Sequence, residues 1–323
     1  MIFPFSKFKI YILILAGFLS VFLNGCASLL PLPSWSPEDF EPSVIKIETI
    51  PFHTQQEKDD CGPATLAMVL KWSGVSTHPD TLSPMLMSPE EKGTLQISMI
   101  AGARRFGRVA YTLSQPEDLL PELAAGHPVI ALQNLGFSWW PKWHYSTVVG
   151  YDLPNKQILL HSGSQNFKKT SIGLFNSTWK SGQYWGLLVL PPSELPATAT
   201  ENRYISSVAS LEQAGHWQNA NNAYKASLVK WPGSIAARIG LSNTYYALND
   251  LDPAEVILRD ALEISPSDGT VLNNLAHILW KQGKNREAAG YALMAIHSGG
   301  PHVDEFRKTY LDIISSQPTI ELN

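Results

Sequence analysis

The chain has 323 residues, a formal net charge of −4 and a pI near 6.1. Nucleic-acid phosphates require a basic surface, so this charge balance argues against nucleic acid as a partner. The apolar fraction of 44% suffices for ordinary cores, and the length fits about one to three domains. With only two cysteines, a disulfide scaffold and a Cys-x-x-Cys zinc or redox site are excluded.

The N-terminus, residues 1–25, is predicted to be a targeting segment. Two lysines precede an apolar stretch over residues 10–23, which is typical of a signal-peptide core and short for a membrane span of about 20 residues. The tetrad that ends at Cys26, Leu-Asn-Gly-Cys, resembles the bacterial lipobox, in which the cysteine is acylated and the preceding peptide removed. Asn24 departs from that motif, which usually has a small residue there.

Acylation of Cys26 would anchor the chain in a bacterial cell envelope. Residues 26–43 are rich in proline, serine and leucine, and we expect them to form a tether. The residue after the cysteine is Ala27 and not aspartate, which by analogy with lipoprotein sorting indicates the outer membrane, facing the periplasm. An uncleaved anchor with an incidental cysteine is the alternative.

The composition changes at residues 192–202, where prolines and small polar residues predict a linker. Strand-like runs stop there, and residues 203–301 repeat with a period of 34. Small residues and turn residues both keep this period, as in Ala220, Ala254 and Ala288, and in Gly215, Asn249 and Gly283. The pattern resembles three tetratricopeptide repeats, which are helix-turn-helix units.

Residues 302–323 are predicted to form a capping helix and a tail, because the last repeat would otherwise expose its apolar face. Stacked repeats usually bind peptides or proteins, so we expect a protein partner on this array. The alternative is that the repeats only pack against the rest of the chain.

Residues 44–191 are predicted to form a domain of mixed α and β structure. The candidate strands are 45–47, 50–52, 129–133, 145–151, 157–161 and 185–190. The candidate helices are 63–72, 94–106, with Thr94 as the N-cap, and 116–125.

Cys61 lies at or just before the start of the first of these helices, because Pro63 suits a first helical turn. A helix N-terminus stabilises a thiolate, which is the nucleophilic form of cysteine. His144 lies at the start of the most apolar strand and follows an aromatic segment. That segment, which holds Phe137, Trp139, Trp140 and Trp143, is expected to pack in the core, to line a cleft or to desolvate the imidazole.

These residues carry a specific resemblance. The segment Gln-Gln-Glu-Lys-Asp-Asp-Cys-Gly-Pro-Ala at residues 55–64, followed by His144 on a strand that ends Gly-Tyr-Asp, is similar to the double-glycine, bacteriocin-processing cysteine peptidases. That family has a papain-like fold, and the resemblance covers residues 45–190. It implies that Cys61 attacks a carbonyl and that His144 accepts and returns the proton. It also implies that Gln55 donates to the oxyanion; the adjacent Gln56 is the alternative.

The family carries an aspartate after the next strand, and here the sequence departs from it. A gap-free count places His161 in that position, where it would need a bulge to reach the first histidine. Asp152 lies about 26 Å along the strand and is a poor substitute. A regular hairpin that pairs Asp152 with Gln157 would bring Gln165 opposite the first histidine, so Gln165 and Asn166 remain alternatives.

The sequence therefore predicts an α+β papain-like domain followed by an all-α repeat array, on a lipoprotein. The expected activity is hydrolysis of a peptide or isopeptide bond in a protein or peptide substrate, through a thioester and without a cofactor or metal. Relatives cut leader peptides inside the cell while fused to export transporters, a substrate that the signal peptide and the lack of transporter segments argue against here. The alternatives are a catalytically silent binding scaffold and a cell-wall peptide hydrolase.

Overall fold

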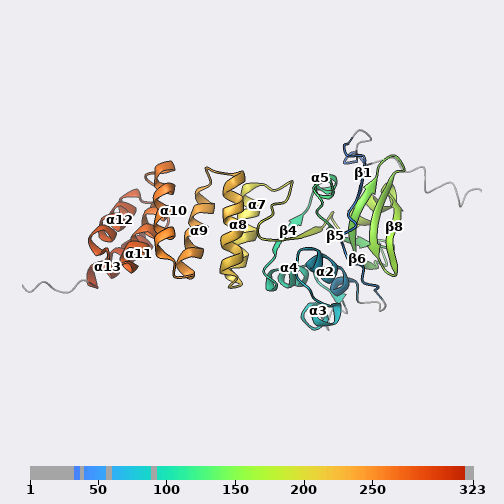
Figure 1. The fold of residues 1–323 in the computed structure, drawn as a ribbon, viewed down its shortest axis with the longest axis horizontal. Helices are drawn as coiled ribbons and strands as arrows, with labels where there is room; N and C mark the ends of the chain where they lie inside the picture. Colours follow the sequence, from blue (N-terminus) through green and yellow to red (C-terminus); the bar gives the residue numbers. More distant parts are fainter. Residues whose placement is uncertain (1–32, 37–39, 56–59, 89–92, 317–323) are drawn as a thin grey trace, which may run out of the picture. The chain divides into compact units, whose positions relative to one another are not determined.

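The computed structural model describes residues 33–36, 40–55, 60–88 and 93–316 (Figure 1). The predicted signal peptide and Cys26 lie outside these residues. The chain divides into two compact units: the first includes Thr112–Leu188, and the second consists of Ile100–Tyr111 and the chain from Val189 onward. Within the described part of the chain, we find no helix with the length and apolar character needed to cross a bilayer.

One sheet has the strand order β4-β9-β5-β6-β7-β8, and β1 also pairs with β6. Its strands are β1 (Val44–Lys46), β4 (Val109–Leu113), β5 (Val129–Asn134), β6 (Trp143–Asp152), β7 (Gln157–Ser162), β8 (Gln165–Ser171) and β9 (Gly186–Leu190). Strand β9 is a continuous apolar run and is wholly buried, as expected for a strand covered on both faces. A small separate hairpin consists of β2 (Met87–Ser88) and β3 (Gly93–Thr94).

Helices alternate with these strands along the chain. They are α2 (Cys61–Trp72), α3 (Pro79–Leu86), α4 (Gln96–Arg105), α5 (Leu119–Ala124) and α6 (Ile172–Ser181), with a short 3-10 turn at Pro116–Asp118. Helix α2 is almost entirely apolar and is buried from Gly62 to Leu70, packed against β6 and α3. Helix α6 places Phe175 and Trp179 in the core beside β5.

All but one of the predicted strands and helices of this unit are found, with boundary shifts. The exception is 50–52, which is predicted as a strand but lies outside the strands of the structure. Thr94 is not a helix cap but the end of β3, and α4 begins at Gln96. Helices α3 and α6 and strands β2, β3, β4 and β8 were not predicted. Strand β8 reads Gln-Asn-Phe-Lys-Lys-Thr-Ser, with little apolar alternation. It takes its strand conformation from pairing with β7.

The β6–β7 hairpin fixes the register near the site. Asp152 pairs with Gln157, as expected for a regular hairpin. The register then shifts between Val148 and Gly150, which leaves Val149 as a bulged residue. Gly150 is required there, since a Cβ atom would lie 2.1 Å from the Ile45 carbonyl oxygen of the neighbouring β1.

The second unit is an array of helices, each packed against the next (Figure 1). They are α7 (Glu201–Gln213), α8 (Trp217–Lys230), α9 (Ile235–Ala247), α10 (Leu251–Ile264), α11 (Gly269–Lys281), α12 (Asn285–Ser298) and α13 (Val303–Ser315). The three alanines of the 34-residue period are fully buried between helices. The turn residues Gly215, Asn249 and Gly283 all have positive φ angles, between 60° and 79°. Sequence periodicity thus located both the helix contacts and the turns.

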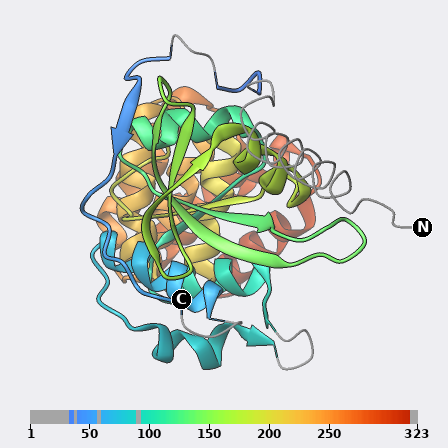
Figure 2. The ribbon, with the colours of Figure 1, turned by 90° about the vertical axis from the view of Figure 1, so that its right-hand side faces the viewer.

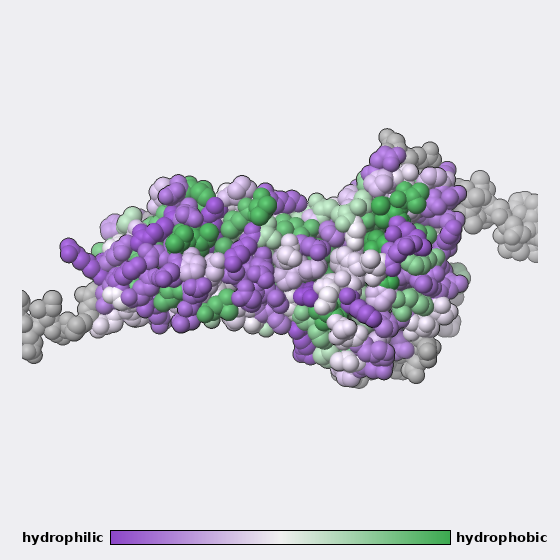
Figure 3. Space-filling view, viewed as in Figure 1, coloured by the Kyte–Doolittle hydropathy of each residue, from purple (hydrophilic) through white to green (hydrophobic). Residues whose placement is uncertain are grey.

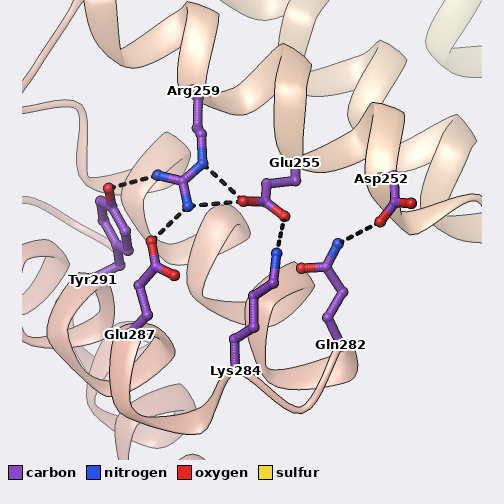
Figure 4. A network of polar contacts seen from close by, with 7 residues as sticks. All are labelled: Asp252, Glu255, Arg259, Gln282, Lys284, Glu287 and Tyr291. Carbon is purple, nitrogen blue, oxygen red and sulfur yellow. Dashed lines mark hydrogen bonds and ion pairs between the residues drawn. The ribbon is translucent and has the colours of Figure 1, made fainter.

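A polar network ties α10 to the next repeat (Figure 4). Arg259 bonds Glu255 on its own helix and Glu287 and Tyr291 on α12, and Lys284 bonds Glu255 at 2.7 Å. Burial acts to raise the pKa of Glu255, but the hydrogen bonds from Lys284 and Arg259 lower it overall. Such partly exposed pairs contribute about 0.2–1 kcal/mol each, so the buried alanine and leucine contacts supply more of the stability.

Part of the second unit comes from an earlier stretch of sequence, Ile100–Tyr111. The guanidinium of Arg203 on α7 lies 4.7 Å from the ring centre of Tyr111. A Cβ atom at Gly107 would meet the Asn219 side chain on α8 at 2.0 Å, so the backbone packs closely there. The first repeat helices are therefore covered by this segment.

Candidate active site

Cys61 is the first residue of α2 and is partly exposed. The preceding Asp60 begins the helix through its backbone, since its carbonyl accepts the Ala64 N–H at 3.0 Å. Gly62 packs against Thr94 so closely that a Cβ atom would lie 2.4 Å from the Thr94 hydroxyl. The residue after the cysteine must therefore be glycine, and the thiol is held where a helix N-terminus favours its ionised form.

His144 is the second residue of β6, and its partner is Ser162, the last residue of β7. The imidazole Nε2 lies 2.9 Å from the Ser162 hydroxyl oxygen. Ser162 is buried. Because a serine hydroxyl carries no charge, the group that binds the imidazole is neutral. Ser162 could not be predicted from local spacing, because its position opposite His144 depends on the one-residue bulge in β6.

Burial, together with smaller contributions from the nearby cations Lys168 and Lys142, lowers the pKa of His144 to about 4. The imidazole is therefore neutral at pH 7. A neutral imidazole with one nitrogen engaged by Ser162 has its other nitrogen available to accept a proton.

His161, the expected third member, lies on the other face of the sheet. It pairs with Thr147, three positions along β6 from His144, and side chains that far apart on a strand point to opposite faces. Its ring is buried between Phe52 and Phe167, and its Nδ1 accepts the Phe167 N–H at 3.3 Å. The prediction that His161 orients the first histidine is therefore wrong, since the bulge changes which β7 residue shares its face.

The two alternatives for the third member lie on β8, the strand that pairs with β7. Gln165 and Asn166 are exposed at the start of β8, where Gln165 pairs with Ser162.

Gln55 is fixed by the turn between β7 and β8. Its N–H donates to the Gly163 carbonyl at 3.0 Å, and its side-chain oxygen accepts the Gly163 N–H at 2.8 Å. Its Nε2 is thereby turned toward β6, 3.5 Å from the Tyr145 carbonyl oxygen. The donor end of the carboxamide thus lies beside the residue that follows His144. The alternative donor, Gln56, lies outside the described residues.

Tyr145 links the cysteine helix to this strand. Its hydroxyl donates to the Thr94 carbonyl at 3.1 Å, next to Gly62. Burial raises the pKa of Tyr145, and negative charge on Cys61 raises it further, so the sulfur lies within electrostatic reach of this ring. Helix α2 packs directly on β6. The fold therefore gathers the Cys61 helix, His144, Ser162 and Gln55 around one end of β6.

The aromatic segment before His144 is not buried in the core. Phe137, Trp139, Trp140 and Trp143 are 67%, 75%, 71% and 52% exposed. They lie on the hairpin between β5 and β6, which projects beyond the other strands of the sheet (Figure 2). The expectation that they pack in the core is wrong.

Residues 47–181 match the model of the Peptidase_C39 like family. Residues 211–263 and 269–298 match models of the tetratricopeptide repeat. The chain therefore carries a C39-like peptidase fold followed by tetratricopeptide repeats, which confirms the predicted fold class. The first match indicates a peptidase-related function and the second a protein-interaction array. No curated protein sequence matches the chain.

The solved structures that resemble this chain match only part of it, and their TM-scores over the whole chain are low. A Bacillus anthracis protein described as a C39-like peptidase is 15% identical, with a TM-score of 0.38, over 46% of this chain and 97% of that one. The peptidase domain of Streptococcus ComA, a transporter in a quorum-sensing pathway, is 22% identical, with a TM-score of 0.36, over 43% and 96%. The Yersinia enterocolitica secretion chaperone SycD is 16% identical, with a TM-score of 0.33, over 35% and 83%.

Proposed function

We propose that this protein is a membrane-anchored cysteine peptidase that hydrolyses a peptide or isopeptide bond. The observation that carries the proposal is a neutral imidazole, His144, oriented by Ser162 beside the helix that begins with Cys61. Nucleophilic acyl transfer requires three groups. They are an activated nucleophile, a base that takes its proton, and a third group that orients the base.

In the proposed reaction, His144 takes the proton of the Cys61 thiol, and the sulfur attacks the carbonyl carbon of the scissile bond. The imidazolium then returns this proton to the leaving amine, which leaves a thioester on the sulfur. Water, deprotonated by the same imidazole, attacks the thioester and releases the carboxylic acid and the thiol. Ser162 binds Nε2 throughout, so Nδ1 is the nitrogen that exchanges the proton.

Gln55 supplies an oxyanion donor in this proposal. Its oxygen is occupied by the Gly163 N–H and its NH₂ group faces β6, so the amide cannot rotate without losing that bond. A donor fixed in advance stabilises the tetrahedral oxyanion without reorganising during the reaction.

Cys26 is the proposed lipid attachment site, which would place the protein in a bacterial envelope, on the outer membrane and facing the periplasm. The motif that ends at Cys26 supports this assignment. The repeat array is proposed to bind a protein partner or substrate. Metabolic labelling with an alkynyl palmitate analogue tests the anchor: a Cys26→Ala variant should lose the label.

The test of the peptidase proposal is covalent labelling of Cys61 by the epoxide inhibitor E-64. Wild type is expected to be labelled at Cys61, whereas Cys61→Ala and His144→Ala are not, because labelling requires an activated thiol. Folding of each variant is checked by circular dichroism. Absence of selective labelling would favour the binding scaffold, and release of soluble fragments from purified peptidoglycan would favour cell-wall peptide hydrolysis.

The pKa of His144 sets the acid limb of the pH profile, and the residue that bonds its imidazole can move it. In wild type, kcat/KM should fall as the pH drops through about 4, because protonated His144 cannot accept the thiol proton. A Ser162→Asp variant places a carboxylate against Nε2, favours the imidazolium and moves the acid limb up by about one pH unit or more. The measurement is kcat/KM of a quenched fluorescent peptide against pH.

The matched control for this change is Ser164→Asp, which adds the same charge at an exposed position two residues further on. It should leave the acid limb within about 0.3 pH units of wild type, because exposed charges are screened. Equal shifts in both variants would contradict the assignment of Ser162 as the partner of His144.

A further inference from the structure

The hairpin between β5 and β6 exposes the densest group of large apolar side chains in the described part of the chain. We define the aromatic hairpin as residues 135–143, which read Leu-Gly-Phe-Ser-Trp-Trp-Pro-Lys-Trp and are all exposed. Elsewhere, exposed apolar residues such as Val229 and Val256 are separated in sequence from other exposed large apolar residues, and Figure 3 shows apolar and polar residues interspersed over the helical unit. Scattered apolar residues need no partner, whereas a contiguous aromatic group indicates a binding surface.

The aromatic hairpin has a fixed shape. Phe137 and Trp140 exchange two backbone hydrogen bonds of 3.1 Å, and the Asn134 side chain accepts the N–H groups of Gly136 and Lys142. The rings of Phe137 and Trp139 stack, with centres 5.5 Å apart and planes 7° apart. The hairpin therefore holds the aromatic side chains in a defined arrangement before binding. The loss of conformational entropy on binding should be small for that reason.

The composition and charge of the hairpin fit a lipid–water interface. Tryptophan is enriched at that interface because its ring is apolar while its N–H can reach water and headgroups. Lys142 is the only charged residue of the hairpin, and no acidic residue occurs between Glu122 and Asp152. A cation with no neighbouring carboxylate in sequence suits an anionic headgroup.

The described end of the N-terminal segment lies at the same end of the domain as the hairpin. Trp35 donates to Asn176 on α6 at 2.8 Å and packs on Trp179. The C-terminal part of α6 lies against the last residues of β5, since Thr178 accepts a hydrogen bond from Gln133 at 2.8 Å. Strand β5 leads directly into the aromatic hairpin.

Trp35 is nine positions after Cys26, and nine extended residues span at most about 30 Å. A bilayer that holds an acylated Cys26 would therefore be within reach of this end of the domain.

We propose that the aromatic hairpin inserts its tip into the lipid–water interface of an anionic bilayer. It acts as a second contact with the membrane, beside the acyl chain that the proposed function places on Cys26, and it rests on that proposed function only for the nearness of the bilayer. Insertion of the hairpin holds the start of β6, with His144, close to the bilayer surface. The accessible substrates are then polypeptides near the membrane.

The test uses the full chain reconstituted in vesicles of dioleoyl phosphatidylcholine and phosphatidylglycerol. A matched set carries bromine on the phosphatidylcholine chains near the headgroup, which quenches tryptophan only at short range. Of the ten tryptophans, those on the hairpin should be quenched. The double change Trp139→Phe and Trp140→Phe should remove about half or more of the bromine-dependent quenching, because both tip reporters are lost while the apolar surface remains.

The control is Trp217→Phe with Trp280→Phe, which removes two tryptophans from the helical unit and should leave the quenching unchanged. A further variant with Phe137, Trp139 and Trp140 all changed to serine should also abolish quenching of the remaining Trp143. No bromine-dependent quenching in wild type, or equal loss in the two double variants, would overturn the proposal. So would a serine variant that only raises KM for a soluble peptide, since the hairpin would then be a peptide-binding surface.

Failure of this proposal can be told apart from failure of the peptidase proposal. Cys61→Ala should retain full quenching, because the lipid contact does not use the thiol. The Cys26→Ala variant lacks the acyl anchor, but in vesicles the same hairpin tryptophans should still be quenched.

Discussion

Replacing His144 with alanine is expected to lower kcat/KM for a quenched fluorescent peptide by about 10²–10⁴-fold, the range that a general base contributes. The reason is that His144 is the proposed acceptor of the Cys61 proton, and its imidazole is neutral at pH 7. The imidazole is half-buried at a strand end and bonds Ser162, so its removal should change the melting temperature little. The measurement is steady-state kinetics of the full chain, with the melting temperature recorded in parallel.

His161→Leu is the matched control, because it removes the other histidine of this hairpin. His161 packs between Phe52 and Phe167 and accepts one backbone hydrogen bond, so the variant should melt at a lower temperature. Its kcat/KM at a temperature where it is folded should stay within about tenfold of wild type. A loss as large as that of His144→Ala would restore His161 to the catalytic group and contradict the role given to Ser162.

The repeat array could be predicted well from sequence because its signal is local and recurs. Ala220, Ala254 and Ala288 keep one spacing, and each is buried at a helix contact. Helix α2 was predicted for the related reason that an unbroken apolar pattern follows a proline in the first turn. In both cases the signal is a set of residue types at fixed spacings along the chain, and reading it requires no knowledge of long-range strand pairing.

The third member of the site could not be predicted in this way. It depends on whether β6 contains one extra residue, and a bulge at Val149 exchanges the faces of every later partner on β7. The Gly150 that permits the bulge is visible in the sequence, but its need arises from β1, which approaches from a distant part of the chain. Register set by a long-range strand pairing is not contained in local spacing.

The aromatic segment shows the opposite failure. Trp139 and Trp140 have the composition of a core, yet they are among the most exposed large hydrophobic residues described. Apolar character predicts that a side chain is removed from water, but it does not specify the environment. A bilayer or a protein partner can bury the side chain as well as the protein interior can. The difference is set by the two-residue turn that carries these rings away from the sheet.

Gln55→Glu is expected to lower kcat by about 10²–10³-fold while KM changes by less than about threefold, which is the signature of a group that binds only the transition state. Glutamate keeps an oxygen to accept the Gly163 N–H, so the turn between β7 and β8 should remain intact and the melting temperature should stay near that of wild type. What it removes is the NH₂ group that faces β6. Quenched-peptide kinetics and thermal melting of the same preparation separate these effects.

Gln56→Glu provides the control, since it introduces the same charge at the next position in the chain. If Gln55 is the donor, this variant should keep kcat within about threefold of wild type, because a screened charge nearby has only a small effect on the oxyanion. If Gln56 is the donor, the large loss moves to it and Gln55→Glu remains active. Because the two residues are neighbours with opposite expected outcomes, the pair distinguishes loss of an oxyanion donor from a general effect of negative charge near Cys61.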